Sequence, residues 1–430
     1  MLYQYAENPR LQLWFSSPNV CAVFLSVTAV LLTGLFLQLH ENKKYFWRVT
    51  AWGFVPLILF HFICLAVTYS RGGYVAVMTA LTVAAGLGKR RIAWLFPVLF
   101  VTVLLLTDHG LARAGSIGNP ADHSIRNRLW LWDGGCGVIF EHWLGGTGPV
   151  PNPGIQYTTF YQPLSLDETY GSLIGDGLTI AASYGIVVFF VIVVVITALF
   201  RQGYRIWKQQ RQIWLPYLLA ALFAYIVGSL FSTCYRFPEI FWLPISLAAI
   251  LLGKISAAKL PWRKYDFIVP LLFAIFVAGG IMVRGAVKFY SRPYMITQVD
   301  SGWRTVPRGE AKGNIYFVMP ADREVIRKYL RPFSENGWNA QAVCYSPEPA
   351  MAACPTLSPI SGEKSLNVLA VSGEKSKQWA EEIISHWHEN GMETVLTIAT
   401  ENDEFPTAEG LFTMIRHRNC TTAGNKGSLF

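Results

Sequence analysis

The stretch IVVFFVIVVVITALF at residues 186–200 decides the class of this chain. It holds no charged side chain, and an apolar surface on every face of a segment is typical of burial in lipid rather than in a soluble core. The whole chain agrees, because 52% of its 430 residues are hydrophobic and only 15% are charged, against about 25% in soluble proteins. These values exclude a wholly soluble enzyme, a disordered chain and a secreted disulfide scaffold.

Apolar segments of this kind recur along the chain and predict an α-helical polytopic membrane protein with about eight transmembrane helices. A helix of roughly 20 residues crosses a bilayer core of about 30 Å, and in lipid only a helix or a closed barrel satisfies its own backbone. The predicted spans are residues 20–39, 49–68, 73–88, 92–107, 178–200, 213–232, 237–253 and 267–283.

Lysine and arginine alternate between the loops and predict the orientation. Loops rich in these residues stay on the cytoplasmic side. The basic loops carry Lys43, Lys44 and Arg48; Lys89, Arg90 and Arg91; Arg201, Arg205, Lys208 and Arg211; and Lys254, Lys259, Arg263 and Lys264. The short segments between them hold only Arg10, Arg71 and Arg236. We therefore expect both termini on the outer, periplasmic side of a bacterial inner membrane.

Two large pieces are expected on that outer side. The first is the loop at residues 108–177, which belongs to a transmembrane domain at residues 1–284 and is too long for a passive connector. The second is a small periplasmic α/β domain at residues 285–430, where strand-like and helix-like stretches alternate and predict a mainly parallel sheet. Its expected strands are residues 314–319, 340–345, 366–371 and 393–399, and its expected helices are residues 321–329 and 374–389.

The charge of the chain limits its partners. Residues 1–284 carry 21 Lys and Arg against 11 Asp and Glu, whereas the tail, residues 285–430, carries 15 Lys and Arg against 16 Asp and Glu. The basic excess therefore belongs to the membrane part, where loop orientation explains it, and no basic cluster on a soluble face indicates nucleic-acid binding. His386 and His388 lie two apart, unlike the i, i+4 pair of a zinc helix, so we expect no metal site.

Two arginines on the predicted outer side oppose the charge pattern. Arg71 follows Thr68-Tyr69-Ser70 and precedes Gly72-Gly73, and Arg236 lies between the sixth and seventh spans. One interpretation is structural: either arginine lies at the membrane interface with its apolar stem in lipid and its guanidinium in water. The alternative is that the two guanidiniums bind a lipid-linked diphosphate through paired hydrogen bonds.

The outer loop supplies further candidates. Arg128 and Trp132 are four residues apart and would share a helix face, whereas Arg126 points to another face. Further along, Glu141-His142 precedes the glycine turn at residues 145–148. This stretch is either an acid/base pair beside a flexible turn or a helix end with a glycine cap.

The order of these motifs resembles the O-antigen ligase and polymerase superfamily, which includes exopolysaccharide polymerases. The resemblance rests on Ser17-Pro-Asn19 entering a helix, Ser70-Arg71-Gly72, Arg128-x3-Trp132, residues 142–148, and Leu178-x6-Gly185-Ile186, and it covers about residues 10–255. It implies a GT-C-like, metal-independent and cofactor-free glycosyltransferase. Such enzymes move a glycan from undecaprenyl diphosphate to a glycan or lipid acceptor at the periplasmic face. The expected surroundings are membrane lipids and other envelope assembly proteins, such as a chain-length regulator.

The resemblance also assigns roles to residues. Arg71 and Arg128 match the outward arginines that neutralise the donor diphosphate, and Arg126 fits the Arg-x10-Gly pattern of polymerases, ending at Gly137. Arg236 is the fourth candidate for diphosphate binding. Such chemistry is plausible on general grounds, because preorganised cations stabilise a leaving diphosphate and an acceptor hydroxyl benefits from a general base.

This chain departs from the family pattern at two points, its start and the position of the ligase histidine. The chain starts just before the Ser-Pro-Asn entry, so we expect a short or N-terminally truncated member. Ligases carry a histidine eleven residues before the helix glycine, where this chain has Ile174. Polymerase activity is therefore favoured over ligase activity. The remaining candidates for proton transfer are Asp176, Asp167, Glu168 and His142.

Two other function classes stay open. A transporter of the polysaccharide or of the lipid-linked glycan should show internal repeats and polar residues at mid-membrane, and the sequence shows neither. A non-catalytic assembly partner is the third class, favoured by the missing histidine.

Overall fold

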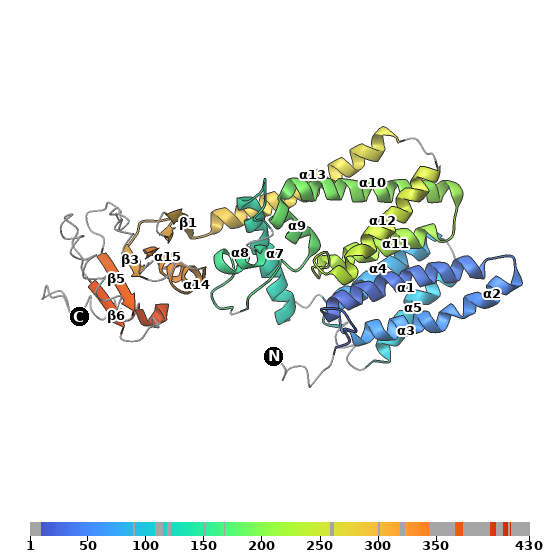
Figure 1. Cartoon of the computed structure of the whole chain (residues 1–430), viewed down its shortest axis with the longest axis horizontal. Coiled ribbons are helices and arrows are strands. Elements are labelled where there is room, and N and C mark those ends of the chain that lie inside the picture. Colours follow the sequence, from blue (N-terminus) through green and yellow to red (C-terminus); the bar gives the residue numbers. More distant parts are fainter. Residues whose placement is uncertain are drawn as a thin grey trace. The chain divides into compact units, whose positions relative to one another are not determined.

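The computed structural model of the chain describes residues 10–88, 91–107, 115–117, 122–148, 152–166, 168–258, 262–299, 302–318, 323–343, 366–372, 396–400, 407–411 and 413. These residues form two compact units (Figure 1). The first consists of residues 1–157 and 169–287, and the second of residues 158–168 and 288–430. Residues 158–168 lie inside the loop predicted to belong to the membrane domain, so the division differs from the predicted one at this segment.

The first unit is helical. Its elements are α1 (Pro18–His40), α2 (Tyr45–Trp52), α3 (Phe54–Val67), α4 (Arg71–Gly88), η2 (Arg91–Trp94), α5 (Leu95–Leu105), α7 (His123–Glu141), α8 (Pro153–Phe160, whose last residues belong to the second unit), α9 (Asp176–Tyr184), α10 (Ile186–Gln210), α11 (Leu215–Leu230), α12 (Pro238–Ala258) and α13 (Lys264–Ser291). Each of the eight predicted spans lies on helical residues for most of its length.

Five helical stretches among the described residues are long and apolar enough to cross a membrane. They are Pro18–His40, Tyr45–Val67, Ile186–Gln210, Pro238–Ala258 and Lys264–Ser291, and two shorter apolar helices, Arg91–Leu105 and Leu215–Leu230, accompany them. Their surface is rich in exposed apolar side chains such as Phe276, which is 78% exposed. Together with the composition, these helices identify a multi-pass membrane protein.

Helix α1 forms the centre of the first unit and packs against α3, α4 and α11. Small residues allow the close approach, as is usual between helices in lipid. A Cβ at Gly73 of α4 would lie 2.7 Å from the Cβ of Ala22, and one at Gly228 of α11 would lie 2.6 Å from a methyl group of Val23. The ends of α1, α4 and α11 are thereby fixed relative to one another.

The second unit contains a six-stranded sheet with the order β1-β2-β4-β3-β5-β6. Its strands are β1 (Tyr294–Val299), β2 (Gly302–Pro307), β3 (Gly313–Val318), β4 (Asn339–Val343), β5 (Leu366–Ser372) and β6 (Leu396–Thr400). The strands β4, β3, β5 and β6 pair in parallel, as predicted. The hairpin of β1 and β2 was not predicted, and it adds an antiparallel edge to the sheet.

Helical residues follow β3 in three short pieces, α14 (Arg323–Val325), the π-helical turn η3 (Ile326–Leu330) and α15 (Arg331–Glu335). They cover most of the helix predicted at residues 321–329. The second predicted helix, at residues 374–389, lies outside the described residues, as do His386 and His388.

A buried arginine holds the loop segment 158–168 inside the second unit. The side chain of Arg331, whose exposed fraction is 4%, donates hydrogen bonds to the carbonyl oxygens of Thr159 and Gln162, each at 2.9 Å. The hydroxyl of Tyr294 donates to the carbonyl of Phe160 at 2.9 Å. These bonds explain why the segment groups with the tail rather than with the helices that precede it in sequence.

Candidate functional site

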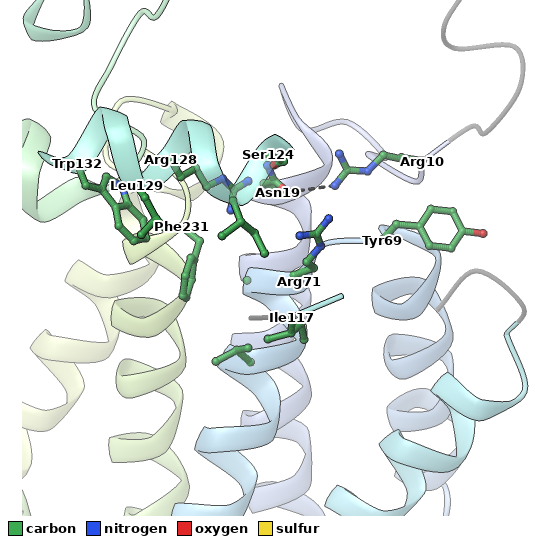
Figure 2. Close-up of a pocket in the computed structure, with 13 residues that line it drawn as sticks. Arg10, Asn19, Tyr69, Arg71, Ile117, Ser124, Arg128, Leu129, Trp132 and Phe231 are labelled. Carbon is green, nitrogen blue, oxygen red and sulfur yellow. Dashed lines mark hydrogen bonds between the residues drawn. The ribbon is translucent and has the colours of Figure 1, made fainter. Parts of the chain in front are cut away.

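A cavity of about 360 Å³ lies in the first unit, where α4 begins and α7 passes the end of α11 (Figure 2). It is lined by Arg10, Asn19, Tyr69, Arg71, Gly72, Val75, Ile117, Ser124, Ile125, Arg128, Leu129, Trp132 and Phe231. None of these lining residues is acidic. The cavity thus combines three cationic side chains with an apolar wall.

Two of the cations, Arg71 and Arg128, lie on helices that Asp122 joins. Arg71 is the first residue of α4, and its guanidinium donates to the carboxylate of Asp122 at 2.7 Å. The other oxygen of Asp122 caps α7 by accepting from the backbone N–H groups of Ser124 and Ile125, at 3.0 and 3.2 Å. Asp122 therefore joins the start of α4 to the start of the helix that carries Arg128.

The third cation comes from the segment before α1. The Nε of Arg10 donates to the carbonyl of Thr68 at 2.9 Å, and a terminal nitrogen donates to the side chain of Asn19 at 3.1 Å. Both of these acceptors are neutral oxygens. Figure 2 shows the guanidiniums of Arg10, Arg71 and Arg128 on one side of the cavity and the rings of Trp132 and Phe231 on the other.

The electrostatics favour a bound anion. The hydrogen bond from Arg71 lowers the pKa of Asp122, so that carboxylate stays charged. Burial lowers the pKa of Arg128, and the like charge of Arg71 lowers it further. Arg71, Arg128 and Asp122 together carry an excess of positive charge, which a phosphate or diphosphate group would neutralise through charge-assisted hydrogen bonds.

Two aromatic rings form the apolar wall. Trp132 and Phe231 contact each other with 6.0 Å between ring centroids, and the indole N–H of Trp132 donates to the carbonyl of Ile174 at 3.0 Å. Gly72 leaves room for this wall, because a Cβ there would lie 2.7 Å from the Cβ of Phe231. The Arg71-Gly72 pair thus provides one cation and the space beside it.

The cavity does not contain the other predicted diphosphate ligands. Arg126 is exposed on another face of α7, where its guanidinium stacks 5.2 Å from the centre of the Trp130 ring. Arg236 donates to the carbonyl of Gly171 at 3.0 Å and to the hydroxyl of its neighbour Tyr235 at 3.2 Å. Of the four predicted arginines, the structure brings Arg71 and Arg128 together.

Asp176, the first candidate for proton transfer, is buried at the start of α9. Its carboxylate accepts hydrogen bonds from the backbone N–H groups of Cys234 and Tyr235, at 2.6 and 3.1 Å, and from the hydroxyl of Tyr225 at 3.2 Å. Burial raises its pKa to about 6, although these three hydrogen bonds oppose the shift. Asp176 is thus two residues from Ile174, which contacts Trp132, but it does not line the cavity.

The remaining candidates lie elsewhere. His142 is exposed and caps the C-terminal end of α7. Glu168 is exposed in the second unit, where its backbone carbonyl accepts from Gln162 at 2.8 Å. Asp167 lies outside the described residues.

The glycine turn after His142 packs on the junction of α9 and α10. Thr147 and Gly148 donate to the carbonyls of Ala182 and Ser183, at 2.8 and 3.0 Å, and Ile186 donates back to Trp143 at 2.8 Å. This geometry favours the helix-end interpretation of the turn over an acid/base pair. It also corrects the predicted continuous span at residues 178–200, because Gly185, with φ of 91°, breaks it into two helices.

Sequence reasoning missed Arg10 and Asp122. The signal that pointed to Arg71 also applies to Arg10, because Arg10 is a basic residue on the predicted outer side. Asp122 is 51 residues from Arg71 in sequence, and only the folded chain shows their pairing.

Comparison with known proteins agrees with this site. Residues 56–173 match the family model described as O-antigen ligase. This match supports the resemblance of the chain to the O-antigen ligase and polymerase superfamily. The matched region begins in α3 and includes both Arg71 and Arg128. No curated protein and no solved structure matches the chain significantly.

Proposed function

We propose that this protein transfers or polymerises a surface glycan from undecaprenyl diphosphate at the periplasmic face of the inner membrane. The observation that carries the proposal is the convergence of Arg10, Arg71 and Arg128 on one cavity with an apolar wall. A lipid diphosphate has the matching chemistry, because its head is anionic and its chain is apolar. The match to the O-antigen ligase family supports the same reaction class.

The proposed reaction needs no metal ion and no cofactor. The acceptor hydroxyl oxygen forms a bond to the anomeric carbon of the donor sugar while the bond from that carbon to the diphosphate oxygen breaks. The electron pair of the broken bond stays on the diphosphate, whose growing charge the arginines stabilise. The proton of the hydroxyl passes to a general base, for which Asp176 is the proposed residue.

Polymerisation is the favoured variant of this function. The chain has Ile174 where ligases carry a histidine, so a ligase-type proton transfer would lack its usual group. Residues 1–284 form the proposed transferase domain. Residues 285–430 form the proposed periplasmic domain, for which we propose contact with the acceptor or with a regulatory partner.

A transfer assay tests the proposal. The purified chain is reconstituted with lipid-linked repeat units, without added metal or nucleotide, and glycan ladders are measured. Arg71→Ala and Arg128→Ala should each lower the rate roughly tenfold to hundredfold, because a charged hydrogen bond contributes about 1.5–3 kcal/mol. Lysine at either position should restore only part of the rate, since it keeps the charge but loses the planar fork.

Arg126→Ala is the matched control, because it removes the same charge from the exposed face of the same helix. Full ladders from the Arg71 and Arg128 variants would refute diphosphate binding at this cavity. Absence of any product from the wild-type chain and its natural membrane partners would refute the enzymatic function and favour an assembly role.

A further inference from the structure

A second cavity lies at the other end of α4 and α10, on the side of the first unit that the basic loops predict to be cytoplasmic. Its volume is about 380 Å³. Most of its lining is apolar and comes from four helices, including Val83 of α4, Phe200 of α10, Leu219 and Phe223 of α11, and Val269 of α13. Val83 and Val269 are 42% and 43% exposed, so the cavity opens on the apolar surface of the unit.

Among the described residues that line this cavity, Arg201 is the one that carries a charge. Its Nε donates to Asp266 at 2.9 Å. In the described part of the chain, its two terminal nitrogens have no hydrogen-bond partner, and its side chain is 33% exposed. Tyr204, three residues further along α10, also lines the cavity.

Asp266 holds Arg201 in place, but its single negative charge does not neutralise both Arg201 and Arg205. The buried carboxylate also accepts from Arg205, from Gln202 at 2.9 Å and from the backbone N–H of Arg263 at 2.7 Å. One negative charge is therefore shared by two guanidiniums. These three side chains, Arg201, Arg205 and Asp266, together keep an excess of positive charge beside the cavity.

We propose that this cavity binds an anionic phospholipid. One acyl chain would occupy the apolar crevice, and the phosphate would accept hydrogen bonds from the terminal nitrogens of Arg201 and from Tyr204. Basic crevices between membrane helices recognise anionic head groups in this way. A zwitterionic lipid would leave the excess charge uncompensated, which is why the site selects phosphatidylglycerol over phosphatidylcholine. This site is separate from the arginine cavity of the proposed function and does not depend on it.

Native mass spectrometry tests the proposal directly. The purified chain is offered equal amounts of phosphatidylglycerol and phosphatidylcholine with the same acyl chains. Both head groups carry a phosphate, but only phosphatidylcholine adds a cation, which Arg201 repels. We expect the wild-type chain to retain phosphatidylglycerol roughly fivefold more than phosphatidylcholine, since one charge near the membrane surface contributes about 1 kcal/mol. Glycerol phosphate, offered alone, should not bind, because it lacks the acyl chain.

Two variants separate the parts of the site. Arg201→Gln should abolish the preference, while Lys208→Gln, which removes the same charge from the same helix outside the cavity, should keep it. Val83→Trp fills the crevice and leaves Arg201 in place, so it should lower the retention of phosphatidylglycerol without touching the head-group site. Equal retention of both lipids by the wild type, an unchanged preference in Arg201→Gln, or equal losses in Arg201→Gln and Lys208→Gln would overturn the proposal.

Discussion

Three arginines, 10, 71 and 128, meet at one cavity although they are far apart in the sequence. Arg71 was predicted because it opposes the charge pattern of the loops and matches a family motif. Arg128 was predicted because it shares a helix face with Trp132 and matches a family motif. Arg10 satisfies the first criterion but precedes the first span and belongs to no quoted motif. The pairing of Arg71 with Asp122 depends on tertiary contacts, which no local pattern encodes.

Asp176→Asn tests the proposed proton acceptor. The amide oxygen can still accept from Cys234 and Tyr235, and its NH2 group can donate to the hydroxyl of Tyr225, so the fold should persist. Because burial raises the pKa of Asp176 to about 6, the folded chain loses stability as the pH rises from the ordinary carboxyl value to about 6 and bears the full cost above it. The amide removes this cost. We expect thermal unfolding near neutral pH at or above the wild-type temperature, with glycan transfer lost.

The pH dependence of transfer separates a proton acceptor from a structural support. A base acts only when deprotonated, so wild-type transfer should rise as the pH increases through about 6 and then level off. Glu168→Gln, at an exposed carboxylate of the second unit, should keep this profile. Full activity in Asp176→Asn would show that Asp176 has only a structural role.

At the scale of elements, the positions of the helices were largely predictable and their breaks were not. Lipid-facing segments are apolar on all sides, so composition alone located the eight segments on helices. The break at Gly185 depends on a packing partner, since a Cβ there would collide with the backbone oxygen of Leu144. The β1-β2 hairpin was not predicted, because the predicted strands were those that alternate with helices and a hairpin has no helix between its strands.

Gly185→Ala should destabilise the α9–α10 junction. The new Cβ meets the carbonyl of Leu144, and φ of 91° is a conformation that alanine rarely adopts. We expect a loss of roughly 1–3 kcal/mol, the usual cost of a strained backbone, measured as a lower unfolding temperature in detergent. Gly86→Ala in α4 is the control, because no atom lies within 4 Å of its added Cβ; an equal loss there would contradict the packing argument.

At the scale of the whole molecule, the charge pattern predicts which parts face the periplasm. Introduced cysteines at Ser165 and Lys312, both exposed, should react with a membrane-impermeant reagent in intact spheroplasts. A cysteine at exposed Lys43, in a predicted cytoplasmic loop, should react only after permeabilisation. The reverse pattern would invert the topology and place the arginine cavity on the cytoplasmic side.

The central claim is that Arg10, Arg71 and Arg128 form a binding site for a lipid diphosphate. Binding of the donor lipid tests this claim most directly. Binding of a polyprenyl diphosphate and of the matching polyprenol is compared by titration calorimetry of the purified chain. We predict that the wild type binds the diphosphate at least about tenfold more tightly than the alcohol. Arg71→Ala with Arg128→Ala should remove that difference, whereas Arg126→Ala should retain it. Equal affinity of the wild type for both lipids, or an undiminished preference in the double variant, would contradict the account.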